Sequence, residues 1–503
     1  MNQLRFDSVS FTYPQLIESL LTNVSFTAPC GWTGIVGANG SGKSTLLALA
    51  TGRLRPTSGM IVRPDTAWYC EQRTDAVPAA LVDLLSFPDS DAGRLVSILG
   101  IEADWPYRWD TLSHGERKRA QIAVALHEMP ELLVVDEPTN HLDREARERL
   151  SVALASFADV GLIVSHDRAL LDRLCGQCLF LEGEGRTVMR PGGVSEGQRQ
   201  QARERLEQRR VYDEATRYRQ RVEAEAVRRR EEAAIQNRKR SKRGLRYKDS
   251  DAREKIDRAR ISGADGQAGR LLRQLDGRRA QAADRLAGAA RPVAERVGVS
   301  VTGRRAKRDS LLRRTAGFLE LPDGRRVRLP DLRVRPDDRI ALQGPNGAGK
   351  STLVAALLDH SRLADDPDLT LFIPQEISAA EAARLVRETR ALANDELGRV
   401  ISTVSRLASD PEQMLSTELP SPGEARKLML ALGLEKRPAL VVMDEPTNHL
   451  DLVSMQCLEA ALADFEGALL LVSHDEAFVR ALARTFWRIM PDGSLEVSAM
   501  TQP

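Results

Sequence analysis

The sequence repeats itself, and this repetition constrains the fold more than any other feature. Three motifs occur twice: GANGSGKST at Gly37–Thr45 and GPNGAGKST at Gly344–Thr352, VVDEPTNHLD at Val134–Asp143 and VMDEPTNHLD at Val442–Asp451, and IVSHD at Ile163–Asp167 and LVSHD at Leu471–Asp475. The copies lie 307 residues apart for the first motif and 308 apart for the other two. Three motifs at a nearly constant separation predict two copies of one domain.

Each copy carries a GxxxxGK[ST] loop in the context that phosphate binding requires. The loop follows an apolar run, Thr33–Val36 or Ile340–Gln343, and precedes a helical run, Thr45–Ala50 or Thr352–Leu358. In a strand–loop–helix unit of this kind, backbone N–H groups and the helix N-terminus surround the phosphates of a nucleotide. The sequence therefore predicts two nucleotide sites.

The side chains of the two loops have distinct expected roles. We expect Lys43 and Lys350 to contact the β- and γ-phosphates, and Ser44 and Ser351 to ligate Mg²⁺. The full set of expected nucleotide-binding residues in the loops is Gly37, Asn39, Gly40, Gly42, Lys43, Ser44, Thr45, Gly344, Asn346, Gly347, Gly349, Lys350, Ser351 and Thr352.

A pair of carboxylates ends an apolar run in each copy. LLVVDE at Leu132–Glu137 and LVVMDE at Leu440–Glu445 each predict a buried parallel strand. Because an unpaired buried charge is costly, paired acids at the end of a core strand indicate chemistry rather than packing. We expect Asp136 and Asp444 to act on Mg²⁺ from its outer coordination shell. Glu137 and Glu445 are the expected general bases, or water-orienting groups, for attack on the γ-phosphate.

A histidine and a glutamine complete each predicted site. His166 and His474 follow apolar runs, each 30 residues after the aspartate of its acidic pair, and we expect them to contact the γ-phosphate. Gln72 and Gln375 follow short apolar runs and are candidate ligands of Mg²⁺ and the attacking water. The alternative for the two glutamines is an ordinary surface position.

An aromatic residue for stacking on adenine is predicted in the first copy only. Tyr13 lies 24 residues before Gly37 and presents a ring that could pack on a base. The second copy has Glu320 at the same offset, with Phe318 nearby. Base stacking is therefore not expected to be equivalent in the two sites.

These motifs together resemble the ATP-binding cassette superfamily over both repeats. The resemblance identifies a signature loop, LSHGE at Leu112–Glu116 and PSPGE at Pro420–Glu424, where the second keeps Ser, Gly and Glu but replaces the leading Leu. In such cassettes the signature of one domain closes over the ATP of the other. The resemblance thus implies one site of Lys43, Asp136 and Glu137 under Ser421, Gly423 and Glu424, and another of Lys350, Asp444 and Glu445 under Ser113, Gly115 and Glu116. The altered second signature makes the first of these the weaker expected site.

EPTNHLD, present twice on one chain, looks like the ABC-F family in particular. This resemblance implies a soluble, ribosome-binding ATPase that uses ATP and Mg²⁺. It implies binding at the ribosomal E site in the ATP-closed state, with a linker acting on the peptidyl-transferase centre and P-site tRNA. Members serve in translation or in protection from antibiotics. Only 41 residues separate Gln72 from Ser113 and 29 follow His474, so we expect neither the inserted arm of some members nor the C-terminal coiled-coil extension of others.

The segment between the copies has a different composition. Arg199 to Arg291 contains 28 basic and 15 acidic residues, and no proline occurs from Gly192 to Arg291. Good helix formers without proline predict a helical hairpin, with a first helix from about Glu196 to Asn237 and breaks at Gly244, Lys248–Ser250 and Ser262–Gly269. A seam of Leu206, Val211, Tyr218, Val222 and Ile235 would face the second helix. The alternative is a solvated, partly disordered linker.

The tip of this hairpin is the predicted RNA contact. Arg228–Lys248 holds ten basic residues against Glu231 and Glu232. Such a density of like charge is relieved by a phosphate backbone, with release of counterions. Tyr247, between Arg246 and Lys248, is placed to stack on an unpaired base. The charge pattern therefore predicts RNA as the partner of the linker, and the resemblance to the ABC-F family implies that this RNA is rRNA and P-site tRNA.

The predicted fold is α/β, with two P-loop ATP-binding cassette domains (1–191 and 301–503) joined by a basic α-helical hairpin linker (192–300). No run approaches the roughly 18 apolar residues of a membrane span, and Met1–Ser10 lacks a signal-peptide pattern. Five cysteines indicate a reducing compartment, so we expect a cytoplasmic protein. The resemblance to tandem cassettes on one chain implies a monomer with intramolecular cassette pairing. Cys175 and Cys178 are expected core residues. The rival functions are an ATPase subunit of a membrane transporter and a nucleic-acid repair ATPase.

Overall fold

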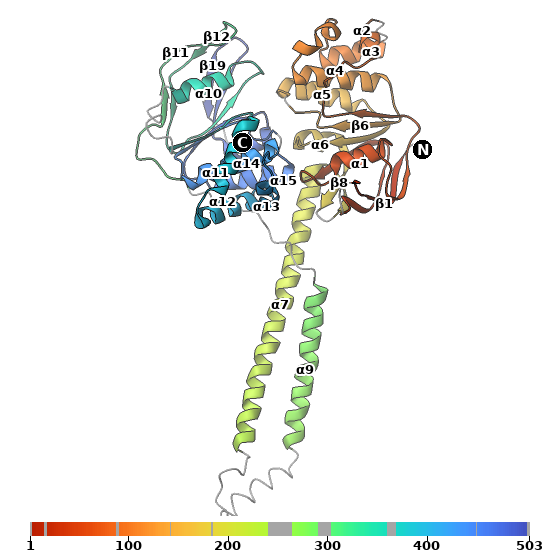
Figure 1. Ribbon diagram of the computed structural model, residues 1–503, viewed down its shortest axis with the longest axis vertical. Coiled ribbons are helices and arrows are strands. Elements are labelled where there is room, and N and C mark those ends of the chain that lie inside the picture. Colours follow the sequence, from red (N-terminus) through yellow and green to blue (C-terminus); the bar gives the residue numbers. More distant parts are fainter. Residues whose placement is uncertain are drawn as a thin grey trace, which may run out of the picture. The chain divides into compact units, whose positions relative to one another are not determined.

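The computed structural model describes residues 3–14, 18–86, 90–140, 142–182, 185–239, 264–289, 303–359, 369–448 and 450–499. They form two compact units (Figure 1). One unit contains both sequence repeats, the first repeat (Met1–Gly197) and the second repeat (Arg296–Pro503). The other, here called the helical unit, is Gln198–Glu295. No helix among the described residues is long and apolar enough to cross a membrane.

The first repeat is built on a six-stranded sheet and a smaller antiparallel one. The large sheet runs in the order β5 (Ala67–Cys70), β6 (Leu132–Asp136), β7 (Val160–Val164), β3 (Gly31–Gly37), β8 (Cys175–Glu182) and β9 (Arg186–Pro191). Only β9 is antiparallel to its neighbour. The small sheet is β2 (Leu21–Ala28), β1 (Leu4–Phe11) and β4 (Ser58–Val62). Strands β6 and β7 are buried at every residue, as expected when helices cover both faces of a parallel sheet.

The helices of the first repeat are α1 (Lys43–Ala50), α2 (Leu81–Ser86), α3 (Ser90–Leu99), α4 (His114–His127), α5 (Arg144–Ala155) and α6 (Arg168–Leu174), with a 3₁₀ turn at Trp105–Thr111. Cys175 and Cys178 begin β8 and are buried, which confirms them as core residues. No cluster of three His, Cys, Asp or Glu that could hold a metal ion occurs in the described ranges.

The second repeat reproduces the large sheet strand for strand. Its order is β15 (Thr370–Ile373), β16 (Leu440–Asp444), β17 (Ala468–Val472), β14 (Arg339–Gln343), β18 (Thr485–Ile489) and β19 (Leu495–Ala499). Two ribbons, β10 (Leu312–Arg314) with β13 (Leu332–Val334) and β11 (Gly317–Glu320) with β12 (Arg326–Leu329), replace the small sheet. The predicted duplication of one α/β domain is confirmed.

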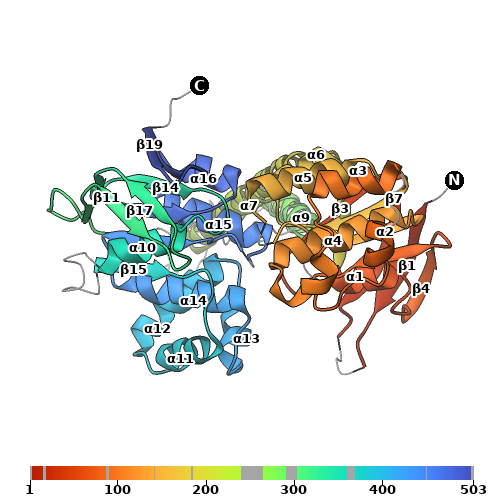
Figure 2. The same cartoon turned by 90° about the horizontal axis from the view of Figure 1, so that it is seen from above.

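The described helices of the second repeat are α10 (Lys350–Asp359), α11 (Ala379–Arg390), α12 (Asn394–Arg406), α13 (Pro411–Ser416), α14 (Pro422–Glu435), α15 (Leu452–Ala463) and α16 (Glu476–Leu482). Helices α11 to α14 form a separate layer beside the sheet. Figure 2 shows α11, α12 and α13 gathered with α14. These four share a small core of their own that includes Leu385, Val400, Met414 and Leu428.

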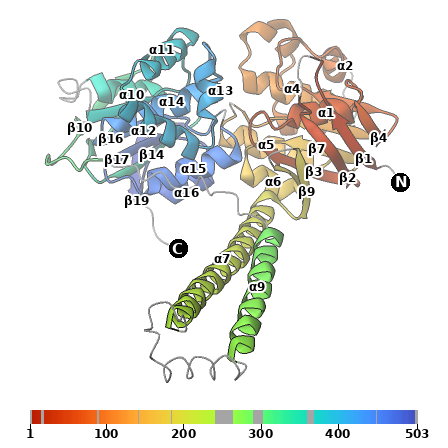
Figure 3. The same ribbon diagram turned by 60° about the horizontal axis from the view of Figure 1, so that its bottom comes forward.

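The helical unit is an antiparallel pair, α7 (Val194–Lys239) and α9 (Ala264–Gly288), which lie side by side in Figures 1 and 3. Val222 on α7 and Ala282 on α9 are buried between them. Ion pairs join Arg279 to Glu223 at 2.6 Å and Arg278 to Glu225 at 3.2 Å. The two paired helices confirm the predicted hairpin and not the alternative of a solvated, partly disordered linker.

Two expectations for the linker are wrong within the described residues. The part of the predicted break at Ser262–Gly269 that the structure describes, from Ala264 to Gly269, is helical in α9, because a glycine costs a helix only about 1 kcal/mol. Leu206, Val211 and Ile235 of the predicted seam are exposed, whereas Val222 is buried. Because Arg279 pairs with Glu223 in the antiparallel arrangement, α9 ends before it reaches the level of Leu206 and Val211. Ile235 lies 13 residues after Val222, which at 3.6 residues per turn places it on the opposite face of α7. The proposed turn at Gly244 and Lys248–Ser250, and Tyr247 with its basic neighbours, lie outside the described residues.

Candidate functional sites

The strands that carry the three repeated motifs are neighbours in each sheet. Strands β6, β7 and β3 stand together in the first repeat, as do β16, β17 and β14 in the second. All are parallel, so their carboxyl ends meet at one edge. Each fold therefore gathers an acidic pair, a histidine and a phosphate loop in one place, where ligands of open parallel sheets bind.

The lysine of each loop folds back across it. Nζ of Lys43 donates to the carbonyl oxygens of Gly37 and Ala38, both at 2.9 Å. Nζ of Lys350 donates likewise to Gly344 and Pro345, at 2.9 and 3.0 Å. Both ammonium groups thus sit over the rim of the loop, at the start of a helix whose N-terminus favours anions.

A hydroxyl and a carboxylate meet beside each lysine. Ser44 donates to Oδ2 of Asp136 at 3.1 Å, and Ser351 donates to Oδ2 of Asp444 at 2.6 Å. Burial raises the pKa of both aspartates above the ordinary value. Tyr69, which the sequence did not indicate, also donates to Asp136 at 3.1 Å. Hard oxygen ligands of this kind suit Mg²⁺, which binds through one or two protein groups and substrate phosphates.

The two predicted bases have strained backbones. Glu137 has φ of 47° and Glu445 has φ of 46°, in the left-handed region that non-glycine residues rarely adopt. Their N–H groups donate to Val164 and Val472 of the adjacent strands, at 2.9 and 2.8 Å, which pins both residues. Backbone strain of this kind persists only where the surrounding structure fixes it, and it is common at functional sites. The strain is the same in both repeats.

Histidine faces the base in each site. Nε2 of His166 lies 3.0 Å from Oε1 of Glu137. In the second site Nε2 of His474 lies 3.6 Å from Glu445 and 3.1 Å from Nζ of Lys350. Burial, then the charge of Lys350, lowers the pKa of His474 to about 3. Burial also raises the pKa of Glu445 to about 7.

Both repeats line the first pocket. Its wall contains Asn39, Gly40, Gly42, Lys43, Ser44, Thr45, Gln72, Asp136, Glu137 and His166 from the first repeat, and Ser421, Gly423, Glu424 and Asp451 from the second. The backbone N–H of Asn39 donates to Oδ2 of Asp451 at 2.8 Å. The structure thus brings together the residues that the sequence assigned to this site, with the second signature among them.

The altered second signature keeps its local geometry. Ser421 caps α14 and shares a capping box with Glu424, as Ser113 does for α4 with Glu116. Pro422 occupies the first turn of α14, where a missing N–H costs nothing. The replacement of Leu and His by proline therefore leaves the serine and glycine at the helix N-terminus, where the N–H groups point outward.

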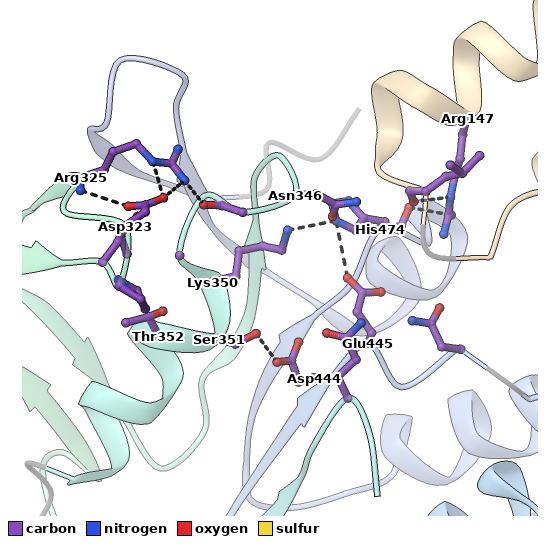
Figure 4. A pocket seen from close by; sticks show the side chains of 17 residues that line it. Arg147, Asp323, Arg325, Asn346, Lys350, Ser351, Thr352, Asp444, Glu445 and His474 are labelled. Carbon is purple, nitrogen blue, oxygen red and sulfur yellow. Dashed lines mark hydrogen bonds and ion pairs between the residues drawn. The ribbon is translucent and has the colours of Figure 1, made fainter. Parts of the chain in front are cut away.

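The second pocket is lined differently (Figure 4). Its wall contains Asn346, Gly347, Gly349, Lys350, Ser351, Thr352, Gln375, Asp444, Glu445 and His474 of the second repeat, and, among the described residues of the first repeat, only Leu142 and Arg147. Ser113, Gly115 and Glu116 are not among the described residues that line it. The cap expected there from the first signature is therefore missing in this arrangement. The contact of Asn346 N–H with Asp143 is also longer than its counterpart, 3.4 Å against 2.8 Å, so the repeats meet less closely on this side.

Tyr13 does not line the first pocket. Its hydroxyl lies 3.0 Å from Oγ1 of Thr45, and its ring packs edge-on against Phe11. In the second repeat Phe318 is 63% exposed, and Asp323 and Arg325 line the pocket instead. Arg325 donates to the carbonyl of Gly347 at 2.7 Å. The stacking role of Tyr13 thus stays a prediction.

The sequence did not indicate Arg147 and Arg426, whose hydrogen-bond partners include residues far away in the sequence. Arg426 is 4% exposed and donates to carbonyl oxygens of Gln375 at 2.5 Å, Glu445 at 3.0 Å and Asn448 at 2.6 Å. It ties the glutamine segment to the segment that carries the base. Only its position beside the second signature could have suggested this.

Comparison with known proteins agrees with this geometry. The family model described as "ABC transporter" matches residues 21–140 and 328–448. ATP-binding protein Uup of Caulobacter vibrioides is 32% identical over 89% of this chain and 71% of its own length. Tylosin resistance ATP-binding protein TlrC of Streptomyces fradiae is 31% identical over 94% and 95%, and ribosome protection protein VmlR of Bacillus subtilis is 28% identical over 89% and 79%.

Solved structures share the fold. A structure described as "RNase-L Inhibitor" superposes with a TM-score of 0.61 at 18% identity, covering 98% of this chain and 90% of that one. An archaeal ribosome recycling factor, solved with a ribosomal stalk protein, superposes with a TM-score of 0.59 at 17% identity, covering 97% and 89%. At these identities the likeness concerns the fold alone.

Proposed function

This chain belongs to the ABC-F family of tandem ATP-binding cassette proteins, and from that premise we propose that it is a cytoplasmic ATPase that acts on the ribosome. The observation that carries the proposal is the first pocket, where lysine, serine, acidic pair and histidine of one repeat lie under the signature serine and glycine of the other. Relatives named for ribosome protection and for tylosin and erythromycin resistance support the ribosome as the target.

The residues of the first pocket suit ATP hydrolysis. Lys43 would contact the β- and γ-phosphates, and Ser44 with Asp136 and Gln72 would hold Mg²⁺. When bound, Mg²⁺ neutralises charge on the phosphate oxygens. Glu137 would orient and deprotonate water, and Nε2 of His166 lies 3.0 Å from that carboxylate.

In our proposal, nucleotide holds the repeats together because each site draws groups from both of them. ATP that binds only the closed arrangement shifts the population toward it, and hydrolysis reverses the shift. Ser421 and Gly423 beside Lys43 support this mechanism in the first site. Alternation between the two arrangements would couple hydrolysis to binding and release of the target.

The helical unit is the proposed RNA-contacting element. Its described residues form a long paired rod whose surface is rich in arginine, including Arg217, Arg219, Arg221 and Arg228. A positive rod favours a phosphate backbone and gives binding that weakens with salt. We propose that the chain binds the ribosomal E site in its ATP-bound state and directs this unit toward the peptidyl-transferase centre and P-site tRNA. The protein would function in translation or in protection of the ribosome from antibiotics.

Sedimentation with ribosomes tests this proposal. The double variant Glu137→Gln/Glu445→Gln keeps the shape of both sites but loses the bases, so ATP should bind and persist. We expect the double variant to sediment with ribosomes in ATP and to remain free in ADP. The matched control, Lys43→Ala/Lys350→Ala, should remain free in both. The proposal would be overturned if the double variant sedimented with ribosomes equally in ATP and ADP, or if it did not bind ribosomes in ATP.

A further inference from the structure

One arginine of the first repeat reaches the nucleotide pocket of the second. Arg147 lies on α5 and lines the pocket formed by Lys350, Glu445 and His474 (Figure 4). Its Nη1 donates to the carbonyl oxygen of His474 at 3.3 Å. Leu142 and Arg147 are the residues that the first repeat contributes to the described wall of this pocket, and Arg147 is the charged one.

The side chain is held by its own repeat while facing the other. Nε of Arg147 donates to the carbonyl oxygen of Leu142 at 3.0 Å, and Nη1 lies 3.6 Å from Oδ2 of Asp167. These contacts fix the guanidinium plane. Among the described residues, none accepts a hydrogen bond from Nη2. The side chain is 19% exposed, so a ligand in the cavity can reach it.

The first pocket has no equivalent of this arginine. Arg147 is the fourth residue after Asp143, and the fourth residue after Asp451 is Met455, which is buried in the hydrophobic core. The first pocket contains Lys427 instead, but that ammonium is engaged by Oγ of Ser409 at 2.8 Å. Two otherwise repeated sites therefore differ at this position by one positive charge.

We infer that Arg147 binds the terminal phosphate of a nucleoside triphosphate held by the second repeat, and that it does so from the first repeat. The inference rests on the proposed function, because it assumes that both pockets take ATP. A planar guanidinium already fixed at Nε is suited to phosphate oxygens, to which it binds more strongly than to neutral acceptors. Because α5 follows directly from Asp143, which contacts Asn346, triphosphate bound in the second site also strengthens the junction of the repeats.

Nucleotide affinity measured one site at a time tests this inference. Lys43→Ala leaves only the second site of the full chain, and Lys350→Ala leaves only the first. Adenylyl imidodiphosphate and ADP, each with Mg²⁺, are titrated without ribosomes by calorimetry. In the Lys43→Ala chain, Arg147→Met should weaken the triphosphate analogue about tenfold or more and ADP less than about twofold, since only the analogue has the terminal phosphate.

The controls separate phosphate binding from a structural role. Arg147→Lys should retain part of the affinity because it retains the charge, and Arg147→Met should change nothing in the Lys350→Ala chain. Equal losses for the analogue and ADP, or a loss in the Lys350→Ala chain, would overturn the inference. If neither background binds the analogue while Arg147 is intact, the nucleotide sites themselves fail, and the role of Arg147 fails with them. Matched melting temperatures show that each variant is folded.

Discussion

The ammonium of Lys350 lies 3.1 Å from Nε2 of His474. In the first repeat the matching histidine lies closer to the base, with 3.0 Å between His166 and Glu137 against 3.6 Å between His474 and Glu445. Because lysine only donates, Nε2 of His474 must accept, and the ring is neutral. The two sites therefore differ in the electrostatics around the base, although their motifs are nearly identical.

Hydrolysis at the second site should depend on pH near neutrality. Burial raises the pKa of Glu445 to about 7, and a base must be ionised to accept a proton, so the rate should rise as pH increases through 7. His474, with its pKa near 3, contributes no second step in this range. The measurement is kcat between pH 5.5 and 9 in the Lys43→Ala chain. A rate that is flat from pH 6 to 8 would contradict this assignment.

Loss of the serine hydroxyl should weaken the metal site. Ser351 donates to Asp444 at 2.6 Å, so Ser351→Ala removes a proposed Mg²⁺ ligand and leaves a buried carboxylate without that bond. We expect the Mg²⁺ concentration for half-maximal ATP hydrolysis in the Lys43→Ala chain to rise about tenfold. Ser41→Ala, in the first loop, serves as the control and should have no effect there. An unchanged Mg²⁺ requirement would remove Ser351 from the metal site.

Replacement of Arg426 should lower the free energy of unfolding more than replacement of most other residues. Its guanidinium is buried and satisfies carbonyl oxygens of Gln375, Glu445 and Asn448, which would otherwise lose their donors. Arg426→Met should destabilise the second repeat by about 3 kcal/mol, measured by urea unfolding. Arg399→Met, which breaks an exposed pair with Glu435, should cost less than about 1 kcal/mol. Similar losses for the two variants would show that the buried contacts are not decisive.

The pairing of α7 with α9 should depend on Val222. This side chain is 1% exposed between the helices, so Val222→Asp buries a charge without a partner. We expect proteases to cut the helical unit much faster in this variant. Leu206→Asp is the matched control because Leu206 is 70% exposed, and its digestion should follow the wild type. If both variants resist proteolysis equally, the helices are not held together at Val222.

Much of the fold and most of each site could be predicted from the sequence. The phosphate loops, acidic pairs and histidines were found because each depends on a short strand–loop–helix segment, and the repeat supplied an internal control. Tyr69 was missed because its contact with Asp136 joins neighbouring strands that are far apart in sequence. Arg426 was missed because its partners come from two segments that are far apart in sequence, around Gln375 and Glu445–Asn448.

Contacts between the repeats were less predictable. The expected cap of Ser113 on the second pocket depends on how closely the repeats meet on that side, and no local motif encodes this distance. Arg147 reaches that pocket instead, and only comparison with Met455 shows that the repeats differ there. The exposed Leu206 and Val211 reflect the length of α9, which their own spacing on α7 does not determine.

A density map of the Glu137→Gln/Glu445→Gln chain bound to ribosomes in ATP is the most direct measurement of the central claim. The account predicts nucleotide in both pockets, with Ser421 over the first. It also predicts the helical unit in contact with RNA between the E site and the P-site tRNA. A bound chain whose helical unit contacts no RNA, or whose pockets contain no nucleotide, would contradict it.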